Sequence, residues 1–191
     1  MIQKTSFSHF SDYLFINLMN TLKMQNHNPI DLLTEKENAT QWLTLMEENG
    51  LLTASQIEQI KQAPIQLDDL RQFRDECRDH FASNKSHDSF IHLLTNATKA
   101  APLSFLLEKK NLTPLPSKGG TQGLLAIMAF QVLQFEGAGL LNKVKACEND
   151  DCLAFFIDQK GKRKWCSMEV CGNRKKAKKH YYTKTKTSKN T

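Results

Sequence analysis

The sequence predicts a mainly α-helical N-terminal domain with one small β-hairpin, an α+β fold, followed by a small cysteine-rich module and a short tail. Two observations lead to this prediction. Apolar residues recur at steps of three and four through most of the first 140 positions, a pattern typical of helices that bury one face. Four of the five cysteines then fall within 25 residues near the C-terminus. We place the helical domain at 1–144, the cysteine module at 145–182 and a basic, disordered tail at 183–191.

The first half of the chain contains four predicted helices. The first is indicated by one apolar face, formed by Phe7, Phe10, Leu14, Leu18 and Leu22. The next two begin at capping boxes, Thr34 with Glu37 and Thr53 with Gln56, and Gly50 ends the earlier of the two. The fourth helix has an apolar face on which we expect a buried, unreactive thiol. This face comprises Leu70, Phe73, Cys77 and Phe81.

Two more helices and a hairpin are predicted before the cysteine module. Phe90–Ala97 has helical spacing of its apolar residues. The stretch 102–116, PLSFLLEKKNLTPLP, has two short apolar runs around a polar turn and prolines at both ends, which favours a β-hairpin. Thr121 can cap the last helix, and Gly137 marks its end or a bend.

Composition limits the class of protein. The longest apolar run is far shorter than the roughly 18 residues that suggest a membrane span, and the N-terminus lacks the pattern of a signal peptide. We therefore expect a cytoplasmic protein that does not contact membranes. Thiols stay reduced there, which favours a metal site over disulfides for a tight cysteine cluster. The six histidines and the adjacent acidic pairs show no shared helix face, so we expect no enzyme activity.

The clustered cysteines have the spacing C-x4-C-x13-C-x4-C and are Cys147, Cys152, Cys166 and Cys171. Four thiolates can close a tetrahedral zinc site, so we predict one structural zinc ion; redox cysteines and unrelated buried thiols are the alternatives. Between the two pairs, 153–158 is strand-like, 159–162 is a turn, and 163–165 returns as the second strand. A helix is expected after the last cysteine. This order predicts a treble-clef-like zinc finger with four cysteine ligands, in which the metal replaces a hydrophobic core.

Charge is divided unevenly along the chain. Residues 159–191 hold twelve Lys or Arg and one acidic residue, whereas residues 1–158 carry a net negative charge. A separated basic block indicates a polyanionic partner. A solvated tail that only aids solubility is the alternative interpretation.

The cysteine module resembles the CGNR zinc finger family, named for the tetrapeptide that is Cys171-Gly172-Asn173-Arg174 here. The family's aromatic residue and aspartate after the second cysteine correspond to Phe156 and Asp158. Its Trp-Cys-Ser-Met is present at 165–168, while Lys164 stands where arginine is usual. The resemblance implies a bacterial, zinc-stapled module that binds nucleic acid.

The N-terminal part is similar to the ABATE domain of stress-induced transcription regulators, which accompanies this finger. The matching pieces are INLMNT (16–21), in which Asn17 replaces the usual Asp, then DLL (31–33), WL (42–43), GLL (50–52) and LRQFRDECR (70–78). The resemblance implies a mostly helical domain that senses a signal or assembles the protein.

The residues expected to contact nucleic acid lie on the predicted hairpin and helix of the module. They are Arg163, Lys164, Asn173, Arg174, Lys175, Lys176, Lys178 and Lys179. Lysines would mainly position phosphates, whereas Arg163, Arg174 and Asn173 have the chemistry to contact base edges. A structural role for Asn173 and Arg174, capping the helix and bonding the knuckle, is equally open.

The sequence thus predicts a zinc-dependent transcriptional regulator that binds duplex DNA. An RNA- or ribosome-associated factor and a zinc-stabilised protein-interaction module are the alternatives. A homodimer and an unidentified small-molecule ligand of the N-terminal domain are open as further partners. The target sequence, the signal and the direction of regulation are not specified by these motifs.

Overall fold

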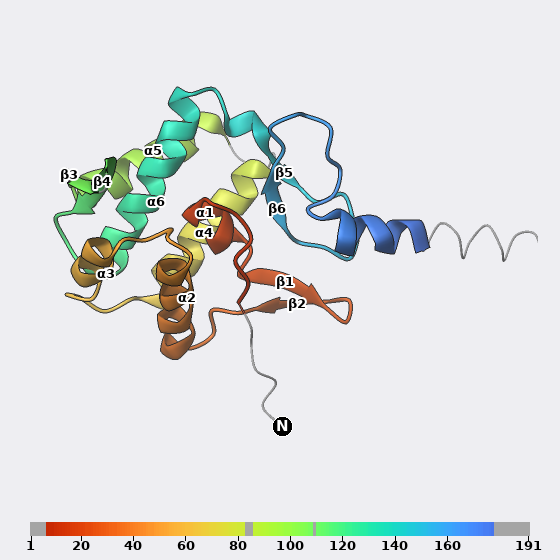
Figure 1. Ribbon diagram of the computed structural model, residues 1–191, viewed down its shortest axis with the longest axis horizontal. Helices are drawn as coiled ribbons and strands as arrows, with labels where there is room; N and C mark the ends of the chain where they lie inside the picture. The colour runs from red at the N-terminus through yellow and green to blue at the C-terminus, as the bar shows by residue number, and fades with distance from the viewer. Residues whose placement is uncertain (1–6, 83–85, 109, 178–191) are drawn as a thin grey trace, which may run out of the picture.

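The structure, a computed structural model, describes residues 7–82, 86–108 and 110–177. Figure 1 shows a helical body with the cysteine module at one end of the long axis. The helices of the body are α1 (Leu14–Met19), α2 (Lys36–Glu48), α3 (Ala54–Ile60), α4 (Leu67–Phe81), α5 (His87–Ala100) and α6 (Gly120–Gly137). Every residue of α1 is buried, and α1 packs against α4 and α6. Across the described ranges, none of the helices has the length and apolarity needed to cross a membrane.

The strands of the described fold form antiparallel hairpins. The pairs are β1 (Leu22–Gln25) with β2 (Asn28–Asp31), β3 (Leu103–Glu108) with β4 (Asn111–Pro116), and β5 (Val144–Ala146) with β6 (Phe155–Ile157). A 3-10 turn, Leu141–Lys143, joins α6 to β5. The last described elements are a π-helical turn, Met168–Gly172, and the α-helical residues 173–177 that follow it.

Several predicted elements are confirmed. The capping box of Thr53 with Gln56 is present at the start of α3. Gly50 adopts φ +72° just after α2, in the left-handed region where glycine carries no steric penalty. Cys77 is buried on α4, and this burial raises the pKa of its thiol well above the ordinary value. The predicted hairpin over 102–116 is β3–β4.

The predicted first helix is wrong in its extent. Phe7 and Phe10 precede α1, and Leu22 begins β1. A second hairpin replaces the end of the predicted helix, because Asn26 and His27 both adopt positive φ, 50° and 63°. Two such residues in succession make the tight turn whose twist suits a hairpin. A local turn preference therefore overrides the apolar spacing at 18 and 22.

Two predicted helix starts are displaced, by one residue at α2 and by two residues at α6, whose N-cap is Gly119. The N-cap of α2 is Glu35, whose capping-box partner is Asn38. Thr34 instead donates its hydroxyl to Asn38 Oδ1 at 2.9 Å. Thr121 lies inside α6, and its hydroxyl accepts a hydrogen bond from the Gln66 amide at 2.6 Å.

The hairpin β5–β6 lies between the body and the cysteine module and contacts both. Successive strand residues point to opposite faces, and the two phenylalanines of β6 use this alternation. Phe155 lies in the large core of the body together with Val144 of β5. Phe156 lies in the small cluster with Cys166 and Cys171. The boundary predicted at 144 falls where β5 begins, and separate folding of the two parts stays a prediction.

Polar side chains of the body form hydrogen bonds that hold the β5–β6 hairpin in place. The Asn20 side chain donates to the Phe155 carbonyl at 2.9 Å and accepts from the Phe155 amide at 2.8 Å, as the backbone of a neighbouring strand would. Arg78 donates to the carbonyls of Met19 at 2.7 Å and Leu153 at 3.0 Å. Its guanidinium also lies 4.8 Å from the centre of the Phe155 ring. Arg78 therefore joins α1, α4 and the segment that enters β6.

Replacing Arg78 with Met should loosen this junction while keeping most of the apolar stem. Two carbonyls lose their charged donor, so we expect the free energy of unfolding to fall by about 2 kcal/mol. Hydrogen exchange followed residue by residue should show the largest acceleration at β5 and β6. The amides of α3, which Arg78 does not contact, are the internal control. Uniform acceleration in both places would contradict the specific role of Arg78 at the junction.

Candidate metal centre

The four clustered cysteines bring their sulfur atoms together. All four Sγ atoms lie within 4.8 Å of one another, with 3.8 Å between Cys152 and Cys166 and 3.5 Å between Cys166 and Cys171. A zinc ion held by sulfur at about 2.3 Å in a tetrahedron places neighbouring sulfurs about 3.8 Å apart. The cluster therefore has the size and the donor set for one zinc ion. Because four protein ligands complete the tetrahedron, such a zinc ion stabilises the fold and leaves no position for a substrate.

The first cysteine pair is positioned by β5–β6. Cys147 follows β5 directly, and its amide donates to the Ala154 carbonyl at 2.9 Å, which extends the pairing of the two strands. The turn between them is closed by Asn149, whose carbonyl accepts from the Cys152 amide and whose Oδ1 accepts from the Asp151 amide. The chain therefore reverses within four residues and returns Cys152 beside Cys147.

The second cysteine pair is positioned by the π-helical turn. The amides of Cys171 and Gly172 both donate to the Ser167 carbonyl, at 3.1 and 3.0 Å. A side chain at Gly172 would lie within about 3 Å of the Met168 sulfur and close to Trp165, so glycine allows this close packing. Trp165 in turn packs against the cysteine cluster. This explains in part why the sequence combines Trp, Met and Gly around the last two cysteines.

Backbone amides and neighbouring thiols tune the sulfur atoms. The Cys166 amide donates to Cys147 Sγ and the Ala154 amide to Cys152 Sγ, both at 3.4 Å. Hydrogen bonding by the Cys166 thiol lowers the pKa of Cys152 to about 5, while the same contact raises the pKa of Cys166. Burial raises the pKa of Cys171 to about 12. One thiolate is thus favoured by its neighbours, and a zinc ion would displace the remaining protons.

The hairpin predicted between the two pairs is wrong in its second strand. β6 pairs with β5, and residues 163–165 form no strand. Asp158 decides this local structure, because its carboxylate accepts from the Arg163 amide at 2.9 Å. Burial acts to raise the pKa of Asp158, but hydrogen bonds from the amides of residues 161–163 outweigh it and the pKa is lowered. The carboxylate thus folds the loop back on itself. The Glu148 amide donates to the Lys164 carbonyl at 3.0 Å, and this bond connects the loop to the first cysteine pair.

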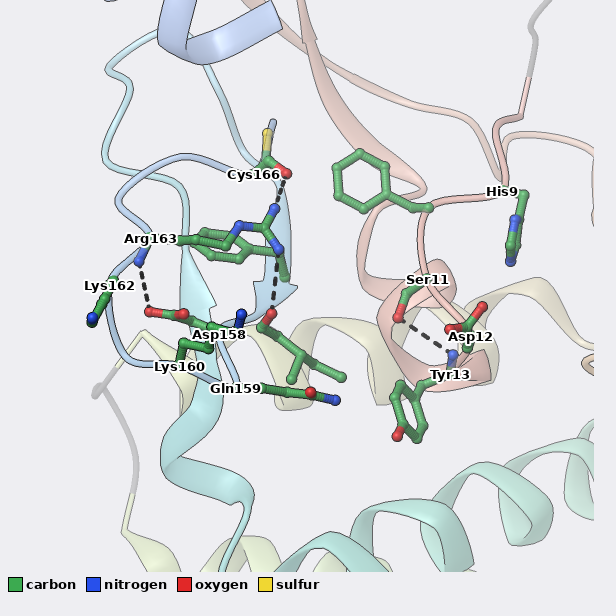
Figure 2. A pocket seen from close by; sticks show the side chains of 13 residues that line it. His9, Ser11, Asp12, Tyr13, Asp158, Gln159, Lys160, Lys162, Arg163 and Cys166 are labelled. Atoms are coloured by element: carbon green, nitrogen blue, oxygen red, sulfur yellow. Dashed lines mark hydrogen bonds between the residues drawn. The ribbon is translucent and has the colours of Figure 1, made fainter. Parts of the chain in front are cut away.

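Arg163 has a structural position within the module. Its guanidinium lies 4.6 Å from the centre of the Phe156 ring and donates to the carbonyls of Cys166 and Ile157. Figure 2 shows these bonds beside a cavity of about 530 Å³ between this loop and the segment that precedes α1. Acidic and basic side chains share its lining, among them Asp12, Lys160 and Lys162.

The other predicted nucleic-acid contacts divide into free and paired side chains. Arg174 and Lys176 are exposed on helical residues 173–177. Lys164 pairs with Glu148 at 3.7 Å and Lys175 with Asp150 at 3.5 Å. The Asn173 side chain, although exposed, donates to the Glu169 carbonyl at 3.0 Å. Lys178 and Lys179, like the tail 183–191, lie outside the described residues.

Sequence reasoning missed three residues that build the site. Asn149 is buried and also donates to the Cys171 carbonyl at 3.4 Å, which connects the two cysteine pairs. Asn20 and Arg78 act from the body, more than 70 positions away along the chain. An asparagine inside a four-residue cysteine gap is a recognisable turn signal. Asn20 and Arg78 lie in two of the segments that resemble the ABATE domain, INLMNT and LRQFRDECR, but neither segment indicates a contact with the cysteine module.

The geometry defines a zinc-binding module with four cysteine ligands, and comparison with known proteins agrees with it. The model of the CGNR zinc finger family matches residues 143–184, a span that contains the four cysteines. No curated protein matches the chain. The predicted zinc site and the predicted resemblance of the module to this family are therefore confirmed.

Proposed function

We propose that this protein is a zinc-dependent transcriptional regulator that binds duplex DNA through the basic helix after its zinc site. One observation carries the proposal. The helical residues 173–177 begin two positions after the ligand Cys171, so zinc would hold the start of the helix firmly. Arg174 and Lys176 are exposed there, and the sequence continues with further lysines. Cations on such a scaffold are presented to phosphates with less loss of conformational freedom than cations on a loose tail.

The ion pairs of the module do not prevent this contact. In the pair of Lys164 and Glu148 both side chains are more than half exposed. Lys175 and Asp150 are also substantially exposed. Exposed pairs of this kind contribute about 0–1 kcal/mol, so both lysines can exchange their carboxylate for a phosphate. Arg163, by contrast, would act mainly by bracing Cys166, and Arg174 becomes the main candidate for a base contact.

The body would be an ABATE-like domain that senses a signal or assembles the regulator in the cytoplasm. Side chains from three of the segments that resemble this domain form one hydrogen-bond network, which supports the assignment. Thr21 and Asp31 both accept hydrogen bonds from Arg74, and Arg78 of the same segment reaches the module. The cavity between the body and the loop 158–163 is where a small ligand would contact both parts. The module would be treble-clef-like, with its first knuckle at the end of β5–β6.

The test is binding of the zinc-loaded protein to random duplex DNA, with selection of the bound sequences. Counterion release gives each phosphate contact about 0.9 in the slope of log affinity against log salt. Changing Lys175, Lys178 and Lys179 together to Ala should therefore lower this slope by roughly 2–3. Lys36, Lys61 and Lys99, exposed on the body, make the matched control, because their replacement removes the same charge and should leave the slope unchanged.

The result separates the proposal from its alternatives. Tighter binding to single-stranded or structured RNA than to any duplex DNA would favour the RNA-associated factor. If the triple variant binds duplex DNA like the wild type at equal salt, the basic helix is not the contact surface. The zinc-stabilised protein-interaction module would then be the better interpretation.

A further inference from the structure

The β3–β4 hairpin exposes a group of large apolar side chains. Leu107 is 77% exposed and Leu112, directly opposite it, is 67% exposed; Phe105 and Leu106 are also exposed. Because alternate strand residues share a face, Phe105, Leu107 and Leu112 lie on one face of the hairpin, and contiguous exposed apolar patches often mark interaction sites. Among the described residues, the body already has its buried core elsewhere, and Phe105 has a ring contact with Phe130 of α6. The patch is therefore not needed to complete the fold of one copy.

The two edges of this hairpin differ in their capacity to pair with another strand. Pro114 and Pro116 of β4 lie opposite Phe105 and Leu103. Proline has no amide hydrogen, so these pairs are the ones in which both main chains point away from each other. The Pro114 carbonyl agrees with this, because it accepts the Gln56 side chain of α3 at 2.8 Å. The outer edge of β4 is thus blocked by prolines and covered by α3.

Among the described residues, no further strand pairs with the outer edge of β3. By the same pairing, the amides and carbonyls of Leu103, Phe105 and Leu107 point outward from β3. No proline or charged residue interrupts 103–107, and the sheet has two strands. Proteins usually guard a strand edge with prolines, charges or a covering element. The outer edge of β4 carries prolines and is covered by α3, whereas the outer edge of β3 is apolar and has no proline. This difference indicates that β3 pairs with a further strand.

We infer that two copies of this chain associate by antiparallel pairing of β3 with β3, which joins the hairpins into one four-stranded sheet. A two-fold axis at Phe105 places Leu103 opposite Leu107 of the second copy. The outward groups of these residues would then form about six main-chain hydrogen bonds. No like charges face each other in this register, since Glu108 lies beyond it, opposite Pro102. The edge is therefore complementary to itself, as a two-fold interface requires.

The size and position of the surface fit a second copy. The strand edge of β3 and the side chains that it carries make a contact at the low end of specific interfaces, below about 1,200 Å² in total. We therefore expect a weak dimer that forms at micromolar concentrations. Figure 1 places β3–β4 at the opposite end of the body from β5–β6. Pairing through β3 would leave the cysteine modules of both copies uncovered.

The experiment is sedimentation of the full-length, zinc-loaded protein over a wide range of concentrations. Leu107→Pro places a proline on the outer edge of β3, as on β4, and removes the amide hydrogen of residue 107 in each copy. The dimer loses two intermolecular hydrogen bonds, so association should weaken about tenfold or more. Leu107→Lys, at a highly exposed position, should act in the same direction and serves if the proline variant folds poorly. Leu112→Lys is the matched control, because it adds the same charge to the same face of the hairpin on β4.

Each outcome decides the inference. It is supported if the wild type dimerises, both Leu107 variants are shifted towards monomers, and Leu112→Lys associates nearly as well as the wild type. A wild type that stays monomeric at all concentrations overturns it. So does a dimer that survives both Leu107 variants. Equal loss in the Leu112→Lys variant would place the contact on the face of the hairpin and also overturn edge pairing.

Discussion

Changing Cys166 to Ser should abolish tight zinc binding and unfold the cysteine module. Cys166 is the ligand whose sulfur lies close to those of both Cys152 and Cys171, and its amide also holds Cys147. Structural zinc binding in small domains is worth about 10–16 kcal/mol, which the few apolar side chains around Phe156 and Trp165 cannot replace. Metal analysis should fall from one zinc per chain to well below one. The fluorescence of Trp165 should shift towards that of a solvated indole.

The body should survive this change with reduced stability. Its core contains Trp42, Phe15 and Leu94, none of which belongs to the cluster around the cysteines, but it also includes Phe155 of β6. We therefore expect α2 and α3 to stay protected from hydrogen exchange while β5 and β6 lose protection. Cys77→Ala is the matched control, because it removes a buried thiol that lies outside the cluster and should leave the zinc content unchanged. Retention of one tightly bound zinc by the Cys166→Ser variant would refute the four-cysteine site.

Replacing Arg74 with Met should lower the free energy of unfolding by about 3–5 kcal/mol, the usual cost of breaking a buried ion pair. Arg74 is 2% exposed. Its guanidinium donates to both carboxylate oxygens of Asp31, at 2.7 and 2.8 Å, and its Nε donates to Asp75 at 2.8 Å. Burial alone would lower the pKa of Arg74, but the hydrogen bonds with Asp31 and Asp75 outweigh it and raise the pKa. The charge is thus stabilised by partners that the variant leaves without a cation. Denaturant unfolding followed by circular dichroism measures the loss.

Arg71→Met provides the comparison for Arg74. It lies on the same helix and pairs with Asp68, which is 94% exposed. Removing such a surface pair should cost less than about 1 kcal/mol. A loss of the same size in both variants would mean that helix propensity or packing of the stem, rather than the buried network, accounts for the effect of Arg74.

Local signals in the sequence identified most of the elements correctly. Gly50 and the box of Thr53 with Gln56 mark helix ends through contacts that span only a few residues. The prolines that flank 102–116 likewise limit that segment to a hairpin. The errors occur where a local turn competes with apolar spacing. Asn26 and His27 redirect the chain into β1–β2 although Leu22 continues the helical pattern.

The zinc ligands were determined by the sequence alone. Their number, spacing and chemistry suffice, because a metal ion imposes its own geometry on any four thiolates that can reach it. The basic block after Cys171 is equally a property of the sequence. Only the tertiary structure showed which strands and loops hold the four cysteines in place. β6 pairs with β5, and the loop after Asp158 closes on itself.

Only the tertiary structure showed that the module and the body share β5–β6. Phe155 and Phe156 are identical in type and adjacent in sequence, yet one lies in the core of the body and the other beside the cysteines. Strand alternation separates them once β6 has partners on both faces. Those partners include Asn20 and Arg78, which are more than 70 positions distant. A contact over that separation depends on how α1 and α4 pack, and periodicity along one segment carries no information about it.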